Sequence, residues 1–274
     1  MNIEEIIIPK NDFIVSQHNN LIMANYDMSA LEQKIFLILL STIKKEDTEI
    51  NTTSFRVTDL SALMNITPQY LYRDLKKACK SIMSKIIEVS NPITGEWELI
   101  NIIPKAKYHS KQGQVTFSLN KDAYPYLLQL KKMFTFFRLE NILPLESKYS
   151  IRIYQQVKSA MYIGSYTISL EDFKKKLMIT KKSYNQFSNI NLKILNPSIK
   201  EINEKTDVSV SIKLIKTGRK VSHIKFCIKP QKTVSFTNSN KTHKYFDYDY
   251  NKLEDGLLGY SDYSVRDVLK KRYE

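Results

Sequence analysis

The chain has 274 residues, and 42 Lys and Arg against 28 Asp and Glu give it a formal net charge of +14 at pH 7. This length is sufficient for one large or two small domains, each with its own core. With 6 Gly and 2 Cys, the sequence contains no glycine-rich phosphate loop, disulfide framework or zinc motif, so we expect neither a cofactor nor a metal. The excess of positive charge indicates either an anionic partner or a role in solvation, and its distribution along the chain helps to distinguish the two.

No segment approaches the ~20 apolar residues of a membrane-spanning helix. Glu4 and Glu5 stand where a signal peptide would carry basic residues. Cys79 and Cys227 are isolated in the sequence, which is typical of buried free thiols. We therefore expect a cytoplasmic protein without membrane contact.

The first predicted helix covers residues 29–44. Ser29 is its expected N-cap, and Glu32 three residues later completes a capping-box pattern. A short strand at 55–57 and a helix with Thr58 as its expected N-cap follow. The dipeptide Thr67-Pro68 then predicts the start of another helix, because threonine can accept free amides and proline suits the first helical position.

The helix after Pro68 is amphipathic. Its apolar side chains recur with a period near 3.6 and predict a buried face formed by Leu71, Leu75, Ala78, Ile82 and Ile86. The opposite face carries Gln69, Tyr70, Arg73, Lys76, Lys77 and Lys80. Two helices separated by a tight turn, the second one basic, indicate a helix-turn-helix. Predicted strands at 85–90, 97–107 and 114–118 complete the element order of a winged helix.

The second half repeats this order. A helix at 146–161, a strand at 166–168 and a helix capped by Ser169 precede a polar and basic connection formed by Lys181, Lys182, Ser183 and Tyr184. A long helix follows, with Ile190, Ile194, Leu195, Ile199 and Ile202 expected inside. Strands at 208–215 and 221–228 then form a hairpin with a cationic tip at 216–220. Residues 171–220 contain 12 Lys and Arg against 5 Asp and Glu, so this half is the more basic one.

The last segment, 231–274, differs in composition and adds little to the net charge. Val265, Val268 and Leu269 are spaced as in a short amphipathic helix within residues 262–273. Such a helix would dock on the body or on a partner, and a frayed tail is the equally open alternative.

Taken together, the elements predict an α+β fold of tandem winged-helix domains, mostly helical with small antiparallel hairpin wings. The expected divisions are an N-terminal domain at 1–140, a C-terminal domain at 141–230 and a tail at 231–274. Two basic helix-turn-helix units favour DNA binding, since Lys and Arg neutralise phosphates while a helix fits the major groove. The four histidines are dispersed and no tyrosine stands out, so we expect no catalytic residue, no metal site and no enzymatic activity.

Three segments resemble the iteron-binding plasmid replication initiator (Rep) family. Its opening pattern is similar to NNLIMA at 19–24 and MSALEQKIF at 28–36. The start of its second domain resembles LPLESKYSIRIY at 143–154. Its closing pattern is similar to LNPSIKEINEKTD at 195–207, followed by GRK at 218–220 and IKF at 224–226.

This resemblance implies two winged-helix domains that grip directly repeated sites in double-stranded origin DNA, with most of the major-groove contacts in the second domain. The implied DNA-binding residues of that domain are Lys182, Ser183, Tyr184, Asn191, Lys193, Arg219 and Lys220. In the first domain they are Gln69, Tyr70, Arg73 and Lys77, with Arg73 pairing with a guanine, held in an ion pair near Asp74, or simply solvated. Related initiators often carry several arginines where this chain has Asn191-Leu192-Lys193 with a single basic residue.

The family further implies homodimers that repress their own promoter, in equilibrium with monomers that bind the repeats. The segment 97–107 offers a dimer surface through Trp97, Leu99, Ile100, Ile102 and Ile103, with a core role as the alternative. The bound protein would open an AT-rich segment and recruit host replication proteins, namely a helicase or its loader and the host initiator. Two alternative functions are a winged-helix transcription regulator without a replication role and a DNA-nicking Rep enzyme.

Overall fold

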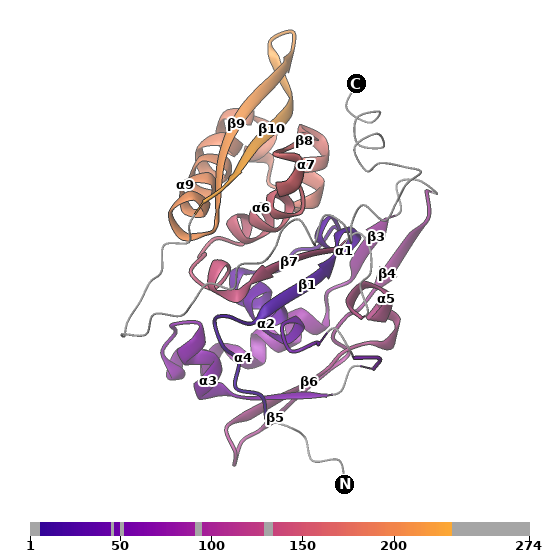
Figure 1. Ribbon diagram of the computed structural model, residues 1–274, viewed down its shortest axis with the longest axis vertical. Helices are drawn as coiled ribbons and strands as arrows, with labels where there is room; N and C mark the ends of the chain where they lie inside the picture. Colours follow the sequence, from indigo (N-terminus) through magenta and orange to yellow (C-terminus); the bar gives the residue numbers. More distant parts are fainter. Residues whose placement is uncertain (1–5, 45–46, 50–51, 91–94, 129–133, 232–274) are drawn as a thin grey trace. The chain divides into compact units, whose positions relative to one another are not determined.

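The structure, a computed structural model, describes residues 6–44, 47–49, 52–90, 95–128 and 134–231 (Figure 1). All of them belong to one compact unit, Met1–Thr233. The predicted helix within residues 262–273 lies outside the described residues.

The N-terminal part alternates short strands and helices. In chain order its elements are β1 (Ile14–His18), α1 (Asn19–Ile22), α2 (Ala30–Leu40), β2 (Thr53–Arg56), α3 (Val57–Leu63), α4 (Pro68–Met83), β3 (Ile87–Ser90), β4 (Trp97–Ile100), β5 (Lys105–His109), β6 (Gln114–Ser118), η1 (Lys121–Ala123), α5 (Tyr124–Leu127), β7 (Phe134–Arg138) and η2 (Leu139–Asn141). Its sheets are β2-β6-β5, β3-β4 and β1-β7. The sequence β2, α3, α4 and hairpin β5-β6 is the winged-helix order that the amino-acid pattern predicts.

The C-terminal part has the same order. Its elements are α6 (Lys148–Ser159), η3 (Met161–Ile163), β8 (Ser165–Ser169), α7 (Leu170–Lys176), η4 (Lys182–Asn185), α8 (Phe187–Ile190), the π-helical turn η5 (Asn191–Leu195), α9 (Asn196–Lys205), β9 (Val208–Thr217) and β10 (Lys220–Pro230). The strands form the antiparallel sheet β8-β10-β9. The tandem winged-helix architecture is therefore confirmed.

Helix α2 begins as its sequence predicts. The Ser29 hydroxyl accepts a hydrogen bond from the Glu32 amide, and the Glu32 carboxylate accepts one from the Ser29 amide, which completes the capping box. The Ser169 hydroxyl likewise caps α7 through the Asp172 amide. These caps satisfy amides that have no partner within the helix.

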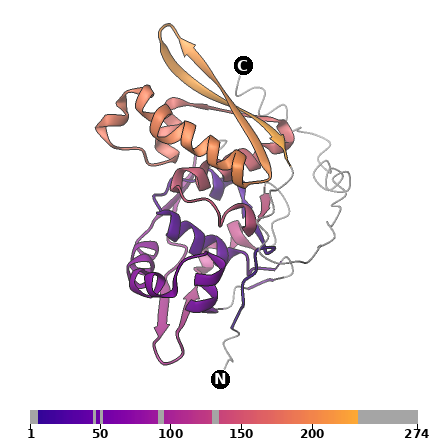
Figure 2. The same ribbon diagram turned by 90° about the vertical axis from the view of Figure 1, so that its left-hand side faces the viewer.

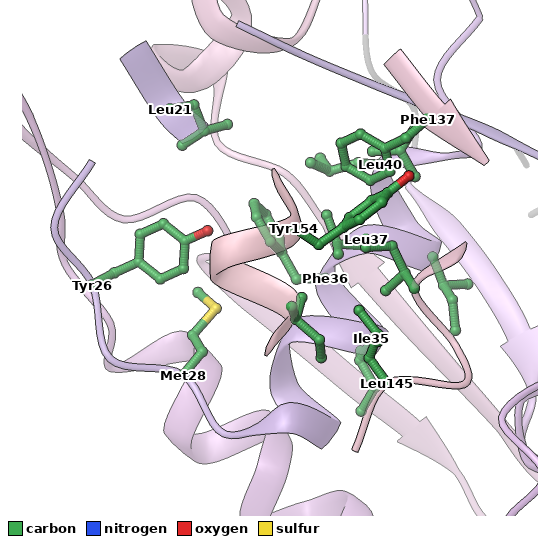
Figure 3. Packing of buried hydrophobic residues seen from close by; sticks show 14 of the residues in the cluster. Leu21, Tyr26, Met28, Ile35, Phe36, Leu37, Leu40, Phe137, Leu145 and Tyr154 are labelled. Atoms are coloured by element: carbon green, nitrogen blue, oxygen red, sulfur yellow. The ribbon is translucent and has the colours of Figure 1, made fainter. Parts of the chain in front are cut away.

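Helices α2 and α6 form the centre of the core. Figure 3 shows Phe36 and Leu37 of α2 with Tyr154 of α6 and Phe137 of β7. The rings of Phe137 and Tyr154 meet edge to face with centroids 5.7 Å apart, and both side chains are buried. Polar residues of α6 are buried as well, among them Arg152 and Gln155, so α6 is enclosed on more sides than an amphipathic surface helix.

The prediction of one strand at 97–107 is wrong. Strand β4 ends at Ile100 and pairs with β3, whereas β5 begins at Lys105 and pairs with β6. Pro104 lies between them, and a proline cannot donate to a strand ladder. The intervening Ile102 and Ile103 are buried in the core instead.

Two further differences concern the ends of elements and long-range pairing. Ile86 was expected on the buried face of the helix after Pro68, but α4 ends at Met83 and Ile86 is 52% exposed. The sequence analysis did not predict β1 and β7, which pair antiparallel with Val15 opposite Phe137. That pairing joins residues more than a hundred positions apart, so neither strand carries a local signal for the other.

Cys79 is buried and Cys227 is half-buried, and both thiols are free. Burial raises the pKa of the Cys79 thiol to about 11. Within the residues that the structure describes, no helix is long and apolar enough to span a bilayer. The same residues contain no cluster of three or more His, Cys, Asp or Glu side chains suited to a metal ion.

Candidate nucleic-acid interface

The turn of the first helix-turn-helix is a Schellman motif. Helix α3 ends at Leu63 with Met64 as its C-cap, and Asn65 takes the left-handed conformation with φ = 52°. The Asn65 amide donates to the Ala62 carbonyl at 3.2 Å, and the Ile66 amide donates to the Ser61 carbonyl at 2.9 Å. These bonds satisfy the last carbonyls of α3 and direct the chain into α4.

The second turn has the same geometry. Met178 follows the end of α7 with φ = 51°, its amide donates to the Lys175 carbonyl at 3.1 Å, and the Ile179 amide donates to the Lys174 carbonyl at 2.9 Å. In both turns an isoleucine and a threonine follow the left-handed residue. The two helix-turn-helix units are thus structural equivalents, although their second helices have different sequences.

The six residues predicted on the outer face of α4 are all exposed: Gln69, Tyr70, Arg73, Lys76, Lys77 and Lys80. Arg73 donates from Nε and Nη2 to the two carboxylate oxygens of Asp74 at 3.0 and 2.9 Å. Its guanidinium also lies over the Tyr70 ring, 4.8 Å from the centroid. The hydrogen bonds from Arg73 lower the pKa of Asp74. Arg73 is therefore held in an ion pair with Asp74 in this structure.

The connection in the second unit folds into the single turn η4. Lys181, Lys182 and Ser183 are exposed, while Tyr184 is partly buried and packs against the core. The Asn189 side-chain amide donates to the Ser183 carbonyl at 2.7 Å, which fixes η4 against the start of α8. The two lysines are therefore held beside the N-terminal end of the long helix that follows.

That long helix runs from Phe187 to Lys205 through α8, η5 and α9. Lys193 is exposed as predicted. Asn191 is half-buried, and its side-chain oxygen is buried without a hydrogen-bond partner among the described residues. Other exposed residues near Lys193 on this helix are Ser188, Leu192, Asn196 and Pro197. Ser188, Leu192 and Asn196 recur every fourth residue, a spacing that places them on one side of a helix.

Strands β9 and β10 form a ribbon of 10 and 11 residues. The ribbon extends past helices α7 and α9 (Figures 1 and 2). Arg219 and Lys220 are exposed at its tip, where Gly218 takes φ = +61° and allows the tight turn. Lys213 and Lys216 on β9 are exposed too, so positive charge lines the outer half of the ribbon.

Other lysines of this region have structural contacts. Lys176 donates to the Met23 carbonyl at 2.6 Å, and Lys175 lies 3.7 Å from the carboxylate of Glu88. Lys205 pairs with Glu201 at 3.2 Å and Glu146 at 3.1 Å. These cations hold elements of the fold together, whereas Lys182 of η4, Lys193 of the long helix and the two cations at the ribbon tip are exposed to solvent.

Comparison with known proteins agrees with this architecture. The family model described as "Initiator Replication protein, WH1" matches residues 14–158, and the model "Initiator Rep protein, WH2" matches residues 169–228. A "Replication initiation protein" of Escherichia coli is 29% identical over 211 residues, which cover 74% of this chain and 66% of that protein. The "PI protein" of Escherichia coli is 29% identical over 204 residues, which cover 62% of this chain and 67% of that protein.

Among solved structures, the fold is similar to that of the Pi initiator protein, which was crystallised in complex with iteron DNA. The TM-score is 0.69 at 24% identity, and the match covers 81% of this chain and 99% of that chain. The two family models match most of the described residues in order, and the chain therefore belongs to the initiator replication protein family, with a WH1 and a WH2 winged-helix domain.

Proposed function

We propose that the protein is a sequence-specific double-stranded DNA-binding initiator of plasmid replication, which binds directly repeated origin sites and promotes origin opening. The observation that carries this proposal is the pair of equivalent helix-turn-helix units, each with an exposed second helix bearing cations. The relatives point the same way, since one is a replication initiation protein and the Pi initiator was solved with iteron DNA. Their matched segments span about two thirds of the curated relatives' lengths.

In this proposal the two units act as separate domains, 1–140 and 141–230, on successive parts of each repeat. Helix α4 would occupy one major groove of the DNA, and the helix 187–205 would occupy another. The β9-β10 ribbon would lie against the adjacent sugar-phosphate backbone of the DNA. The proposed contact residues are Gln69, Tyr70, Arg73, Lys76, Lys77, Lys80, Lys181, Lys182, Ser183, Tyr184, Asn191, Lys193, Arg219 and Lys220. Exposed cations contribute affinity by neutralising phosphates and releasing counterions.

The direct test measures binding of the full chain to duplexes taken from the DNA that flanks its gene. We expect a clear preference for a repeated site over scrambled DNA of the same composition at physiological salt. Equal affinity for both duplexes would refute the proposal. Arg219→Ala should weaken binding to every duplex and lower the salt dependence by about one phosphate contact. Lys229→Ala is the matched control, because Lys229 is exposed on the same ribbon at the end remote from the tip.

A transcription regulator would share this binding chemistry. A plasmid that carries the gene and its flanking repeats, but no other initiator, separates the two functions: replication supports an initiator, and failure to replicate supports a regulator. Incubation with supercoiled DNA and a divalent metal tests the nicking alternative. We expect no nicked product, because in this proposal the protein opens the origin by binding and distorting the DNA and not by cutting it.

We further propose that the protein forms homodimers through β4. Trp97 and Leu99 alternate along one face of this strand and are 68% and 56% exposed. The free edge of β4 has no partner strand among the described residues, so a second copy can pair there by main-chain hydrogen bonds. The dimer would repress the gene's own promoter, and the monomer would bind the repeats and recruit the host helicase or its loader and the host initiator.

Sedimentation of a variant with Trp97→Glu and Leu99→Glu tests the dimer surface. We expect this variant to be monomeric at concentrations where the wild type dimerises, because charge would be buried at the new interface. Ile163→Glu is the control, since Ile163 is 49% exposed and lies outside β3 and β4. An unchanged dimer in the β4 variant would exclude this surface.

A further inference from the structure

Leu192 is the most exposed large apolar side chain on the long helix of the second unit. It is 66% exposed, while Ile190, Ile194 and Leu195 around it are fully buried. Ser188, Lys193 and Asn196, all polar or charged, are exposed beside it on the helix, and Pro197 is exposed after Asn196. An isolated apolar side chain is thus surrounded by hydrogen-bonding and cationic groups.

The π-helical turn determines this arrangement. The Asn196 amide donates to the Asn191 carbonyl, five residues back, instead of to the carbonyl four residues back. Pro197 explains the widening, because its ring would clash with the Lys193 carbonyl in a regular α-helix and it has no amide hydrogen to donate. Within the wide turn Leu192 and Lys193 are both exposed, and the next two residues, Ile194 and Leu195, are both buried.

The groups around Leu192 indicate which kind of partner this side chain contacts. An apolar protein surface would have to bury Lys193, together with the lysines of η4 held beside the start of the helix, without compensating charge. Duplex DNA provides phosphates for these cations and also presents an apolar group in its major groove, the C5-methyl of thymine. Leu192 lies in the first half of the second helix of a helix-turn-helix, the part that faces base edges when such a helix enters the major groove.

We propose that Leu192 contacts the C5-methyl group of a thymine in the origin repeat and so determines which base is accepted at that position. This assignment rests on the proposed function. It gives the chain a sequence-determining contact that needs no charge, next to Lys193, which is the one basic residue of the segment 191–193. Lys193 would then supply phosphate or guanine contacts beside the thymine.

Deoxyuridine tests the contact, because it replaces thymine without altering any hydrogen-bonding group and removes only the methyl. Binding of the full chain to a repeat duplex would be compared with binding to duplexes in which each thymine is replaced in turn. We expect one position at which the replacement lowers wild-type affinity about threefold to fivefold, the effect of one methyl group removed from water. Leu192→Ala should lower affinity for the thymine duplex by a similar factor or more, and should be insensitive to deoxyuridine at that position.

Lys193→Ala is the matched control. It should weaken binding yet keep the full deoxyuridine effect, because it leaves Leu192 in place. Leu192→Met should retain most of the wild-type affinity and its preference for thymine. Since Leu192 is largely exposed, we expect the same thermal unfolding midpoint for Leu192→Ala and for the wild type, which excludes a folding defect as the cause.

Two results would overturn the inference. One is a wild type that binds the repeat specifically but is indifferent to every deoxyuridine replacement. The other is a Leu192→Ala variant that keeps the wild-type deoxyuridine effect, since another residue would then contact the methyl. Failure of the proposed function looks different, because in that case the wild type would not prefer the repeat to scrambled DNA at all.

Discussion

Arg152 of α6 is buried against Tyr26, with its guanidinium carbon 3.9 Å from the centre of the tyrosine ring. Its Nη1 donates to the Tyr26 hydroxyl, and its Nη2 donates to the Ala24 carbonyl at 2.7 Å. Burial raises the pKa of the Tyr26 hydroxyl, so this group stays neutral. One buried cation thereby fastens the segment between α1 and α2 to the central helix.

Removal of this cation should destabilise the protein strongly. We expect Arg152→Ala to lower the free energy of unfolding by about 3 kcal/mol, because it leaves a cavity and a buried carbonyl without a donor. Tyr26→Phe should cost about 1–2 kcal/mol, since it removes only the hydroxyl acceptor. Urea unfolding followed by circular dichroism measures both values. Equal stability of Arg152→Ala and the wild type would contradict the anchoring role.

The Arg73–Asp74 ion pair predicts a gain in DNA affinity when the acid is removed. In Asp74→Asn the Arg73 guanidinium loses its charged partner on α4, and one negative charge leaves the surface that we propose contacts the DNA phosphates. We expect roughly threefold tighter binding at low salt, with the difference shrinking as salt rises. Fluorescence anisotropy titrations at several salt concentrations provide the measurement. Asp12→Asn makes the same charge change outside α4 and should have a smaller effect.

His18 predicts a dependence of stability on pH. Its Nδ1 accepts a hydrogen bond from the Asn20 amide at 3.2 Å at the start of α1, and burial lowers the pKa of the ring below its ordinary value of 6.5. The unfolded chain therefore binds this proton more readily than the folded protein. The contribution of His18 to stability is complete above pH 6.5 and is lost as the pH falls from 6.5 through the lower folded value.

His18→Asn keeps a cap acceptor that does not titrate, so its stability should vary less between pH 7.5 and 5.5 than that of the wild type. His18→Ala should cost about 1 kcal/mol at pH 8 through loss of the cap. His223→Asn, at an exposed position, is the control and should keep the wild-type profile. Thermal unfolding midpoints measured across this pH range test the prediction. The same dependence of the midpoint on pH in the wild type and in all variants would refute the role of His18.

Met178 predicts a stabilising substitution. It has φ = 51°, a conformation that is strained for a residue with a Cβ, and its side chain lies at the surface with 37% exposure. We expect Met178→Gly to raise the free energy of unfolding by about 0.5–1 kcal/mol. Asn65→Gly at the equivalent turn should change it less, because asparagine tolerates this conformation well. Urea midpoints for the two variants test the comparison.

The amino-acid sequence by itself determined the local features of this protein. The capping box at Ser29 and Glu32, the start at Pro68, the Ser169 cap and the 208–230 hairpin follow from spacings of a few residues, and the exposed cations of α4 follow from helical periodicity. The family resemblance rested on short segments of the same kind. Each of these signals lies within one element, where helix and turn geometry is set by neighbouring residues.

Only the tertiary structure decided which long-range contacts form. The pairing of β1 with β7, the division of 97–107 between two sheets and the burial of Arg152 against Tyr26 join residues that are distant along the chain. The exposure of Leu192 depends on how the π-helical turn packs its neighbours into the core. Local patterns do not encode such contacts, because their energy comes from burying surfaces that meet only in the folded chain.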